Sequence, residues 1–551
     1  MKIALLYNKE NDFNDLPHLI YETFNRDIKN FLDIGFNIPV FFYDINKEFN
    51  LTEDIIICLI DNKFVLNKEK FLRYYNTYKS SNKFIFISYT KSYSRIEEIL
   101  HLNYIDGAEE NKIILNNILY EIVRYIFGIK KLKLFLSYKR DNEKQISLEK
   151  IRNYVFKNSK INTFLDVFSI EYGEDFEEEI KNEMQNSVLV SFWSDNYTQS
   201  EWCKNEVIFA RKYNIPIVII DCLEHKDTNS YPYMFNTLVL KCELNEEEII
   251  KEILLETIRF FNNRMRLEKF KENYALKEFY ITPRRVESLD LLYNGKVLYP
   301  DPPIGKNEKA LLKGEFITPT EYFTKFNLNK KIAVSVSETD NFDNGVEIKH
   351  LQDVIVEIVR FLMLSGNQII YGGDIKYCLG LNFAEIIFDL ALKYSTKKPA
   401  VINPLPTKFY KKIDDSIRAK YIDIIEFKEA NDDLSKMREY MSSIENARII
   451  IGGKLQGYQG KYPGVLEEAY YTLKAKKPLY IIGAFGGVAK EIVKLRNGKE
   501  IEEWKGFEIY NDVKTLPLNN GLSEKENNIL FYSKDIDEII KVIMKGLKNE
   551  A

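Results

Sequence analysis

The chain has 551 residues, a formal net charge of -4 at pH 7, 45% hydrophobic residues and 29% charged residues. A chain of this length is expected to form about three or four domains, each with enough apolar residues for a core. Because basic residues are interleaved with acidic ones, the sequence does not support nucleic-acid binding. There is no apolar run of about 18 residues and no amino-terminal signal sequence, so we expect a cytoplasmic protein that is not inserted in a membrane.

Cysteine and histidine give no sign of a metal centre. The five cysteines are scattered without a CxxC pair, which argues against zinc and against a disulfide framework. The four histidines are also far apart and form no catalytic constellation. We therefore expect no metal and no cofactor.

The first 128 residues alternate apolar strand-like runs with helical segments. The runs cover residues 3–7, 38–42, 55–60 and 83–88. Strands that alternate with helices favour a parallel sheet, because each helix returns the chain to the same end of the sheet. Residues 1–128 are therefore predicted to form an α/β domain with a flavodoxin-like parallel sheet.

A second α/β pattern occupies residues 130–262. A helix is predicted to begin after Ser200, whose side chain is suited to capping the first turn. In that helix Trp202 and Glu206 are four residues apart and share a face. We expect both side chains to point into one cleft at the carboxyl end of the preceding strand, residues 188–193, where ligands of open α/β sheets usually bind.

The segment from Ser194 to Glu206 resembles the catalytic segment of a TIR (toll/interleukin-1 receptor) domain. Other parts of the family pattern lie in the expected order: an opening strand at residues 132–138, a second strand that ends at Asp166, and a later strand at residues 215–221. TIR enzymes cleave NAD with a glutamate at this helix position, so the resemblance implies that Glu206 is catalytic. It also implies substrate-binding roles for Tyr138, Lys139, Arg140, Asp166 and Trp202.

The chemistry of NAD cleavage explains why a carboxylate would be needed. Breaking the bond between nicotinamide and ribose leaves an oxocarbenium-like sugar, which a fixed carboxylate in a poorly solvated cleft stabilises. By the resemblance, Trp202 forms a wall of the cleft and Lys139 or Arg140 contacts the pyrophosphate. The alternatives are a solvated helix carboxylate for Glu206, simple packing for Trp202 and solvated loop charges for the two basic residues.

The first 128 residues align with the TIR-like region. When residues 55–78 are laid against residues 189–212, both strands and both helices match, but Leu72 takes the place of Glu206. Residues 1–128 are thus predicted to be a degenerate TIR-like domain without the catalytic carboxylate. An unrelated flavodoxin-like domain remains the alternative.

A connecting region is expected at residues 263–329. Residues 245–274 have helical periodicity, and five of the fifteen prolines follow between Pro283 and Pro319. Proline cannot continue a helix or a central strand, so this region is predicted to be irregular or an ordered arm between domains.

The carboxyl-terminal part, residues 330–551, again alternates strands with helices, and its strands end in glycines. Glycine lets backbone amides approach a phosphate, and the helix that follows adds a favourable dipole. We expect these ends to form a nucleotide-sized cleft at one edge of a Rossmann-like sheet, and Lys454 is the first residue expected to contact a phosphate. The predicted ligand-binding residues are Gly372, Gly373, Gly453, Lys454, Gly486 and Gly487.

Residues 454–468 resemble the SLOG family, whose Rossmann-like domains bind nucleotides and their derivatives. One branch splits nucleoside monophosphates with a Pro-Gly-Gly-x-Gly-Thr motif, but the sequence Pro463-Gly464-Val465 lacks the second glycine, and the threonine and a matching arginine are also missing. The similarity is closer to the sensor branch of Thoeris antiphage effectors, which binds a cyclic ADP-ribose isomer. Glu467 and Glu468 could equally be charges that favour the start of a helix.

The two resemblances together predict a bacterial immune effector of the Thoeris or CBASS type. In this hypothesis the SLOG domain binds a cyclic ADP-ribose isomer or a related nucleotide signal, and the TIR domain then hydrolyses NAD to ADP-ribose and nicotinamide. The alternatives are a non-catalytic TIR scaffold with a nucleotide-binding module, and a TIR cyclase that produces a cyclic signal. Family behaviour implies self-association through both domains, including filaments.

Overall fold

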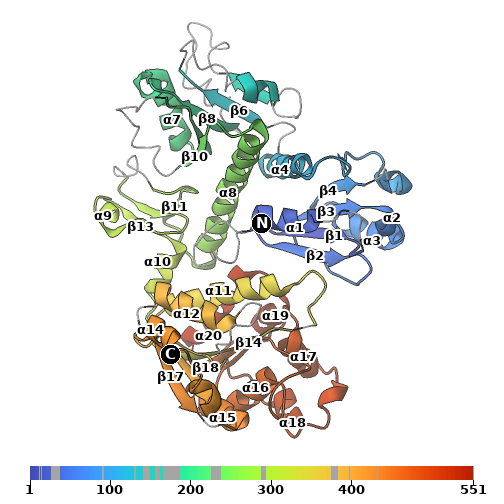
Figure 1. Cartoon of the computed structure of the whole chain (residues 1–551), viewed down its shortest axis with the longest axis vertical. Coiled ribbons are helices and arrows are strands. Elements are labelled where there is room, and N and C mark those ends of the chain that lie inside the picture. The colour runs from blue at the N-terminus through green and yellow to red at the C-terminus, as the bar shows by residue number, and fades with distance from the viewer. Residues whose placement is uncertain are drawn as a thin grey trace. The chain divides into compact units, whose positions relative to one another are not determined.

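A computed structural model describes the chain apart from residues 11–12, 14, 26–37, 90–91, 129–131, 140–148, 155–161, 166–186, 225–236, 287–292, 340, 374–381, 396, 431 and 550–551. The described chain forms two compact units, the first ending at Pro319 and the second continuing from Thr320 (Figure 1). None of the helices in the described part has the length and apolar character that crossing a membrane requires.

The first unit begins with a five-stranded parallel sheet in the order β2-β1-β3-β4-β5. Its central strands β1 and β3 are buried throughout their length because helices cover both faces. The strands are β1 (Ile3–Tyr7), β2 (Val40–Asp44), β3 (Ile55–Ile60), β4 (Lys83–Ser88) and β5 (Ile105–Asp106). The helices are α1 (Leu16–Phe24), α2 (Asn62–Val65), α3 (Lys68–Tyr78) and α4 (Asn111–Phe127).

A second five-stranded parallel sheet follows in the order β10-β9-β8-β6-β7. Its described helices are α7 (Glu201–Lys212) and α8 (Glu246–Asn273). The strands are β6 (Lys133–Ser137), β7 (Asn162–Leu165), β8 (Ser187–Trp193), β9 (Ile217–Asp221) and β10 (Leu238–Lys241).

The two sheets have the same topology. Counted within each sheet, the strand order is 2-1-3-4-5 in both, and α3 lies after β3 as α7 lies after β8. Leu72 is in α3 at the position that Glu206 has in α7, and it packs partly buried against an apolar cluster. The topology agrees with a duplicated domain, but flavodoxin-like folds have this order as well. Whether residues 1–128 are a degenerate TIR-like copy therefore stays a prediction.

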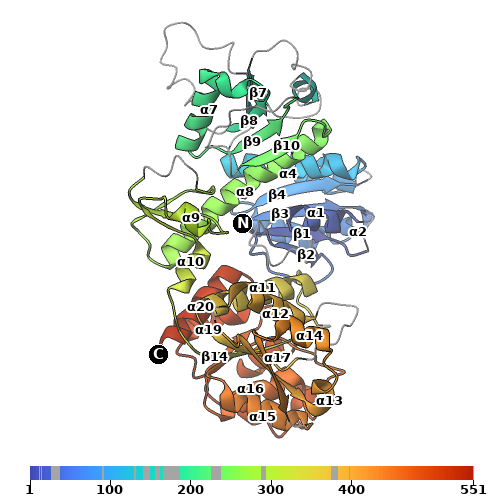
Figure 2. The same ribbon diagram turned by 60° about the vertical axis from the view of Figure 1, so that its left-hand side comes forward.

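The two sheets share one apolar core. It contains one face of each sheet together with residues of α1, α4 and α8. The rings of Phe127 in α4 and Phe261 in α8 lie 4.5 Å apart, and the Asn116 amide donates a hydrogen bond to the Glu247 carbonyl. Figure 2 shows α4 and α8 side by side. Helices α4 and α8 therefore form a layer common to both domains, while α7 covers the opposite face of the second sheet.

Helix α8 passes through residue 262, where the sequence places the end of the TIR domain, and that boundary stays a prediction. The helix runs without interruption from Glu246 to Asn273, because buried residues continue from Ile249 to Leu267. A three-stranded parallel sheet follows, made of β11 (Phe279–Ile281), β12 (Lys296–Leu298) and β13 (Glu315–Ile317) in that order, and we call it the connecting sheet. The region expected to be irregular or an ordered arm thus contains an ordered sheet, and α9 (Lys306–Lys309) lies between β12 and β13.

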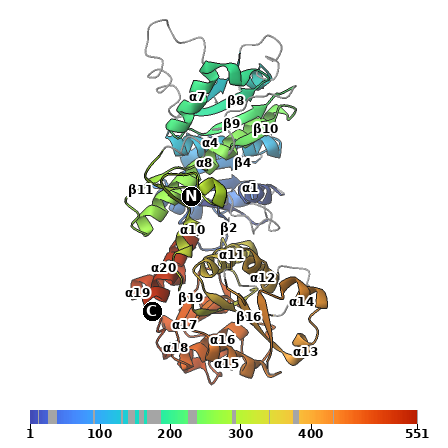
Figure 3. The same ribbon diagram turned by 90° about the vertical axis from the view of Figure 1, so that its left-hand side faces the viewer.

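The second unit is built on a six-stranded parallel sheet in the order β17-β16-β15-β14-β18-β19. Helices α11 and α12 pack together on one face and α15 and α16 on the other, with the sheet between them (Figure 3). The strands are β14 (Lys331–Ser337), β15 (Gln368–Ile370), β16 (Val401–Pro406), β17 (Ile425–Ala430), β18 (Ala447–Gly452) and β19 (Leu479–Ile482). The helices are α10 (Pro319–Thr324), α11 (Ile348–Leu364), α12 (Phe383–Tyr394), α13 (Thr407–Tyr410), α14 (Asp415–Tyr421), α15 (Leu434–Ile444), α16 (Gly464–Lys474), α17 (Gly487–Arg496), α18 (Tyr510–Thr515), α19 (Glu524–Tyr532) and α20 (Ile536–Asn549).

Candidate functional site

Helix α7 begins where the sequence predicts. The Ser200 side chain accepts a hydrogen bond from the Cys203 amide at 3.3 Å, which caps the first turn. Cys203, Val207 and Ala210 then pack with the α7-facing side of the sheet. Glu206 lies on this same helix face, since it is three residues after Cys203 and four before Ala210.

Glu206 is completely buried, and neither oxygen of its carboxylate has a hydrogen-bond partner in the described part of the chain. A buried carboxylate without partners is unfavourable by several kcal/mol when ionised, and native structures seldom retain one without a reason. No hydrogen bond in the described part of the chain compensates this cost.

Hydroxyl groups lie on the same side of the sheet as α7. Ser137 at the end of β6 pairs in register with Ser191 in β8. The Ser137 hydroxyl lies 2.6 Å from the Tyr197 hydroxyl, which is also buried, so the two form a hydrogen bond. The Ser191 hydroxyl is buried without a partner among the described residues. Sequence analysis did not single out these hydroxyls, although polar residues inside apolar strand runs were a signal for them.

Two of the other predicted TIR residues, Trp202 and Tyr138, have surroundings that differ from those of Glu206. Trp202 is 58% exposed, although it is only one helical turn from the fully buried Glu206. The α7 face that packs on the sheet includes Glu206, whereas Trp202 is mostly exposed, and the cleft expected for both side chains stays a prediction. Tyr138 packs partly buried against the core on the other face of the sheet, and Lys139 is half-buried. Arg140 and Asp166 lie outside the described residues.

In the second unit, the predicted glycines follow the carboxyl ends of strands in one parallel sheet. Gly372 and Gly373 follow β15 and Gly453 follows β18, the two neighbours of β14, while Gly486 follows β19, which pairs with β18 on its far side. The strand order reverses between β14 and β18, and open α/β sheets bind ligands at the carboxyl end of such a switch point. Lys454 lies there with its side chain exposed.

The amides at this edge are occupied by the protein itself. The Gly453 and Lys454 amides donate to the carbonyl and the hydroxyl of Ser337, and the Gly487 amide donates to the Asn341 carbonyl. A Cβ on Gly487 would lie 2.5 Å from the Gly452 carbonyl carbon, and Gly487 has a φ of +66°. In this arrangement the glycines allow two loops to touch through their backbones, and a phosphate would have to displace these hydrogen bonds.

Glu467 and Glu468 are not free charges at a helix start. Arg438 of α15 forms an ion pair with Glu467, and the Arg438 guanidinium also donates to the Gln459 carbonyl at 3.3 Å. Arg448 of β18 pairs with Glu468 at 2.6 Å. Sequence analysis missed both arginines as partners, although an arginine at the start of the apolar run of β18 was a signal that a buried acid had to be near.

A second acid completes the Arg448 cluster. The Arg448 guanidinium contacts Glu445 at 2.5 Å, and the Thr472 hydroxyl donates to the same carboxylate at 2.6 Å. Arg448 and Glu445 have no exposed side-chain surface. Burial raises the pKa of Glu445, and the Arg448 guanidinium and the Thr472 hydroxyl oppose that rise. This fully paired cluster binds α16 to the sheet.

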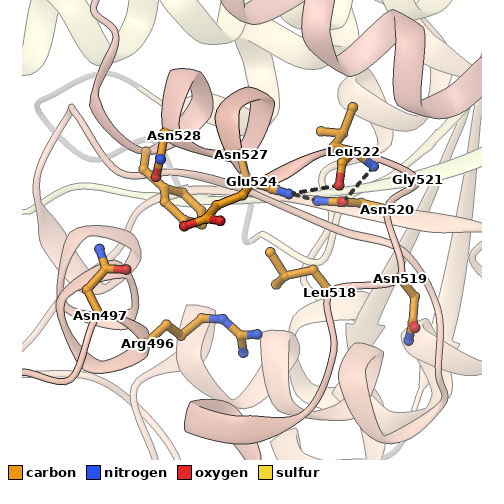
Figure 4. Close-up of a pocket in the computed structure, with 11 residues that line it drawn as sticks. Arg496, Asn497, Leu518, Asn519, Asn520, Gly521, Leu522, Glu524, Asn527 and Asn528 are labelled. Atoms are coloured by element: carbon orange, nitrogen blue, oxygen red, sulfur yellow. Dashed lines mark hydrogen bonds between the residues drawn. The ribbon is translucent and has the colours of Figure 1, made fainter.

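A cavity of about 430 Å³ lies elsewhere in the second unit. Its wall includes Arg496, Asn520 and Asn527, and Figure 4 shows the hydrogen bond between the last two, 2.8 Å long. Asn520 also donates to the Leu479 carbonyl at 2.9 Å. Because Leu479 begins β19, this cavity lies at the amino end of that strand, opposite the glycine edge. It is not the cleft that the glycine pattern predicts.

The comparisons with known proteins agree with this division of the chain. Residues 134–246 match the model of the TIR domain family, and residues 326–432 and 429–517 match the model of the SLOG cluster2 family. No curated protein matches the chain. The fold and the family matches thus define a protein with a TIR domain of α/β type and a Rossmann-like SLOG domain. The chain has the TIR-SLOG architecture, with the SLOG domain carboxyl-terminal to the TIR domain.

Proposed function

We propose that this protein is an antiphage effector in which the TIR domain cleaves NAD⁺ and the SLOG domain controls that activity by binding a nucleotide signal. The observation that carries the proposal is Glu206, a buried carboxylate without a hydrogen-bond partner among the described residues, in the Trp-Cys-x-x-Glu segment of a TIR domain. Its role would be to stabilise the oxocarbenium-like ribose and to bind the ribose hydroxyls.

The burial of Glu206 supports a gated enzyme. A carboxylate with no exposed surface cannot contact NAD⁺, so α7 or the segments that cover it must move before catalysis. A ligand can drive such a movement only by binding one state more tightly than the other. We propose that the described arrangement is the resting state, which suits an activity that depletes NAD and must be silent until a signal arrives.

The glycine edge of the SLOG domain is the proposed site of that signal. Its place at the strand-order switch point supports a nucleotide ligand, and a cyclic ADP-ribose isomer is the class we propose. Lys454 is suited to contact a phosphate because its side chain is exposed beside Gly453. Binding there would replace the hydrogen bonds that now join Ser337 and Asn341 to the glycine loops. Without these hydrogen bonds, the two loops would be able to shift relative to each other.

The test is nicotinamide release from NAD⁺ by the full chain and by Glu206→Gln, with and without a panel of cyclic ADP-ribose isomers. Release that requires one isomer and disappears in Glu206→Gln would support a gated NADase. Separation of ADP-ribose from cyclic products would distinguish hydrolysis from cyclisation, which share the first step. Binding of an isomer without any NAD cleavage would contradict the enzyme and favour a TIR scaffold with a nucleotide-binding module.

A further inference from the structure

We propose that the connecting sheet transmits the state of the SLOG domain to helix α7 through the side chain of Asn214. This proposal rests on the proposed function, because it assigns the route by which the sensor would reach Glu206. The argument has three parts: the contact at Asn214, the link from Asn214 to Glu206, and the link from the connecting sheet to the second unit.

The contact is made by both ends of one amide side chain. Asn214 follows α7 by two residues, and its Nδ2 donates to the Tyr280 hydroxyl of β11 at 2.7 Å. The Thr282 hydroxyl donates to Asn214 Oδ1 at 3.4 Å. Thr282 is buried and its amide bonds to the Leu298 carbonyl of β12 at 3.1 Å. Asn214 is therefore bound to the edge of the connecting sheet rather than to a mobile side chain.

Asn214 also belongs to the end of α7. It has a φ of +53°, a left-handed conformation that asparagine adopts more readily than most residues. Its amide donates to the Arg211 carbonyl, and the Ile215 amide closes the helix on the Ala210 carbonyl at 2.8 Å. Glu206 lies eight residues before Asn214, about 12 Å along a helix axis. A displacement of Asn214 thus acts on the last turn of the helix that carries Glu206.

The other end of the connecting sheet leads directly into the second unit. Only Thr318 separates β13 from α10. In α10 the side chain of Phe323 is 1% exposed, and its ring centroid lies 4.4 Å from that of Phe361 in α11. Because α10 is packed into the SLOG core, any shift of α11 is passed to β13 through the covalent chain. The connecting sheet is then the mechanical link between α11 and α7.

Hydrogen exchange on the full chain tests this coupling without a ligand. Phe323→Ala removes the side chain that packs α10 against α11. We expect it to raise the exchange rates of the Tyr213, Asn214 and Ile215 amides by about threefold or more, within the range of measured couplings. Asn214→Gly keeps the left-handed backbone and removes the amide side chain. In that background the effect of Phe323→Ala on these amides should vanish.

Matched variants separate coupling from general loosening. Tyr280→Phe removes only the hydroxyl that Asn214 bonds and should also abolish the effect, whereas Tyr293→Phe nearby should not. Asn329→Gly changes another asparagine with a φ of +54° and serves as the backbone control. If Phe323→Ala unfolds the second unit, the same experiment is carried out with Phe361→Leu. The proposal is overturned if Phe323→Ala leaves the exchange rates at the end of α7 unchanged, or if it raises them equally in the Asn214→Gly background.

Nicotinamide release separates this proposal from the proposed function. If a cyclic ADP-ribose isomer stimulates nicotinamide release by the wild type, Asn214→Gly should retain the unstimulated rate. The fold-stimulation of the variant by the isomer should be at least about ten times smaller, which is within the usual range of allosteric coupling. Equal stimulation of both proteins overturns the coupling alone. Coupled exchange in a chain that never cleaves NAD⁺ overturns the enzyme and leaves the connecting sheet as a route from the sensor to a TIR scaffold.

Discussion

Glu206 in the TIR domain and Glu445 in the SLOG domain are both withdrawn from solvent, but only one of them is paired. Glu445 receives the Arg448 guanidinium and the Thr472 hydroxyl at 2.5 and 2.6 Å. Glu206 receives no hydrogen bond in the described part of the chain. Each buried carboxylate is costly, so the difference lies in whether the surrounding structure compensates it.

The comparison separates a paired buried acid from one that has no partner in the described part of the chain. A buried acid that is fully paired stabilises the arrangement of the elements that supply its partners, here α16 and β18. A buried acid without partners destabilises the arrangement in which it is buried, so a movement that exposes the acid costs less free energy. We therefore expect loss of Glu445's partner to harm folding, and loss of Glu206 to harm activity alone.

The largest expected effect is on NAD cleavage. Replacing Glu206 by glutamine should lower nicotinamide release by about a hundredfold or more, since a positioned carboxylate stabilises the charge of the transition state. The free energy of unfolding should stay equal or rise, because an uncompensated buried acid is removed. Glu201→Gln, on the exposed side of the same helix, is the control and should change neither quantity. A large loss of stability in Glu206→Gln would make Glu206 a structural acid.

The next effect is on the stability of the SLOG domain. Arg448→Met should lower the free energy of unfolding by about 3–5 kcal/mol, because it leaves Glu445 buried without its counter-charge. Hydrogen exchange of the β14 and β18 amides measures this within the full chain. Adding Glu445→Met should recover part of the loss. No loss in the single variant would show that the cluster is not stabilising.

A smaller effect is expected at Glu467. Glu467→Gln keeps the size of the side chain but removes the charge that Arg438 faces, and it should lower stability by about 1–3 kcal/mol. Glu508→Gln is the matched control, because its ion pair with Lys461 is exposed and should contribute nothing measurable. Denaturant unfolding compares the two variants. Equal unfolding midpoints for the two variants would show that the buried Arg438–Glu467 pair stabilises this domain no more than the exposed Lys461–Glu508 pair.

The smallest effect concerns pH. The side-chain hydrogen bond from Lys545 and the contacts with Ser523 lower the pKa of Glu526 to about 2. Because the folded pKa lies below the unfolded one, this group stabilises the SLOG domain above the unfolded pKa of about 4.5 and ceases to do so as pH falls toward 2. In Glu526→Gln the melting temperature should therefore decrease less than in the wild type as the pH is lowered from about 4.5 toward 2. An identical pH profile would show that the Glu526 contacts are too exposed to matter.

Much of the fold follows from local sequence patterns. The runs at residues 3–7, 55–60 and 83–88 form strands with those bounds, and the helix expected after Ser200 starts at Glu201. Apolar periodicity and a capping side chain act within a few residues, so they can be read without knowing the rest of the molecule. The glycines after three strands lie at the same end of one sheet, because parallel strands share their carboxyl ends, and the ligand site expected there stays a prediction.

The sites required contacts that no local pattern encodes. Arg438 and Glu467 are 29 residues apart in the chain, and Arg448 and Glu468 are 20 apart. Helical periodicity placed Trp202 and Glu206 on one face but could not show that packing would bury only Glu206. Likewise, the glycines predict close backbone approach, and only the structure shows that the partner is another loop of the protein.

The sequence by itself therefore determined the α/β class, the order of the domains and the identity of the catalytic candidate, because hydrophobic period and short motifs are properties of neighbouring residues. The tertiary structure decided which acids are paired, which are isolated and how α7 is bound to the connecting sheet. Burial and long-range pairing depend on residues that meet only after folding, and these two properties distinguish Glu206 from the other buried acids of the chain.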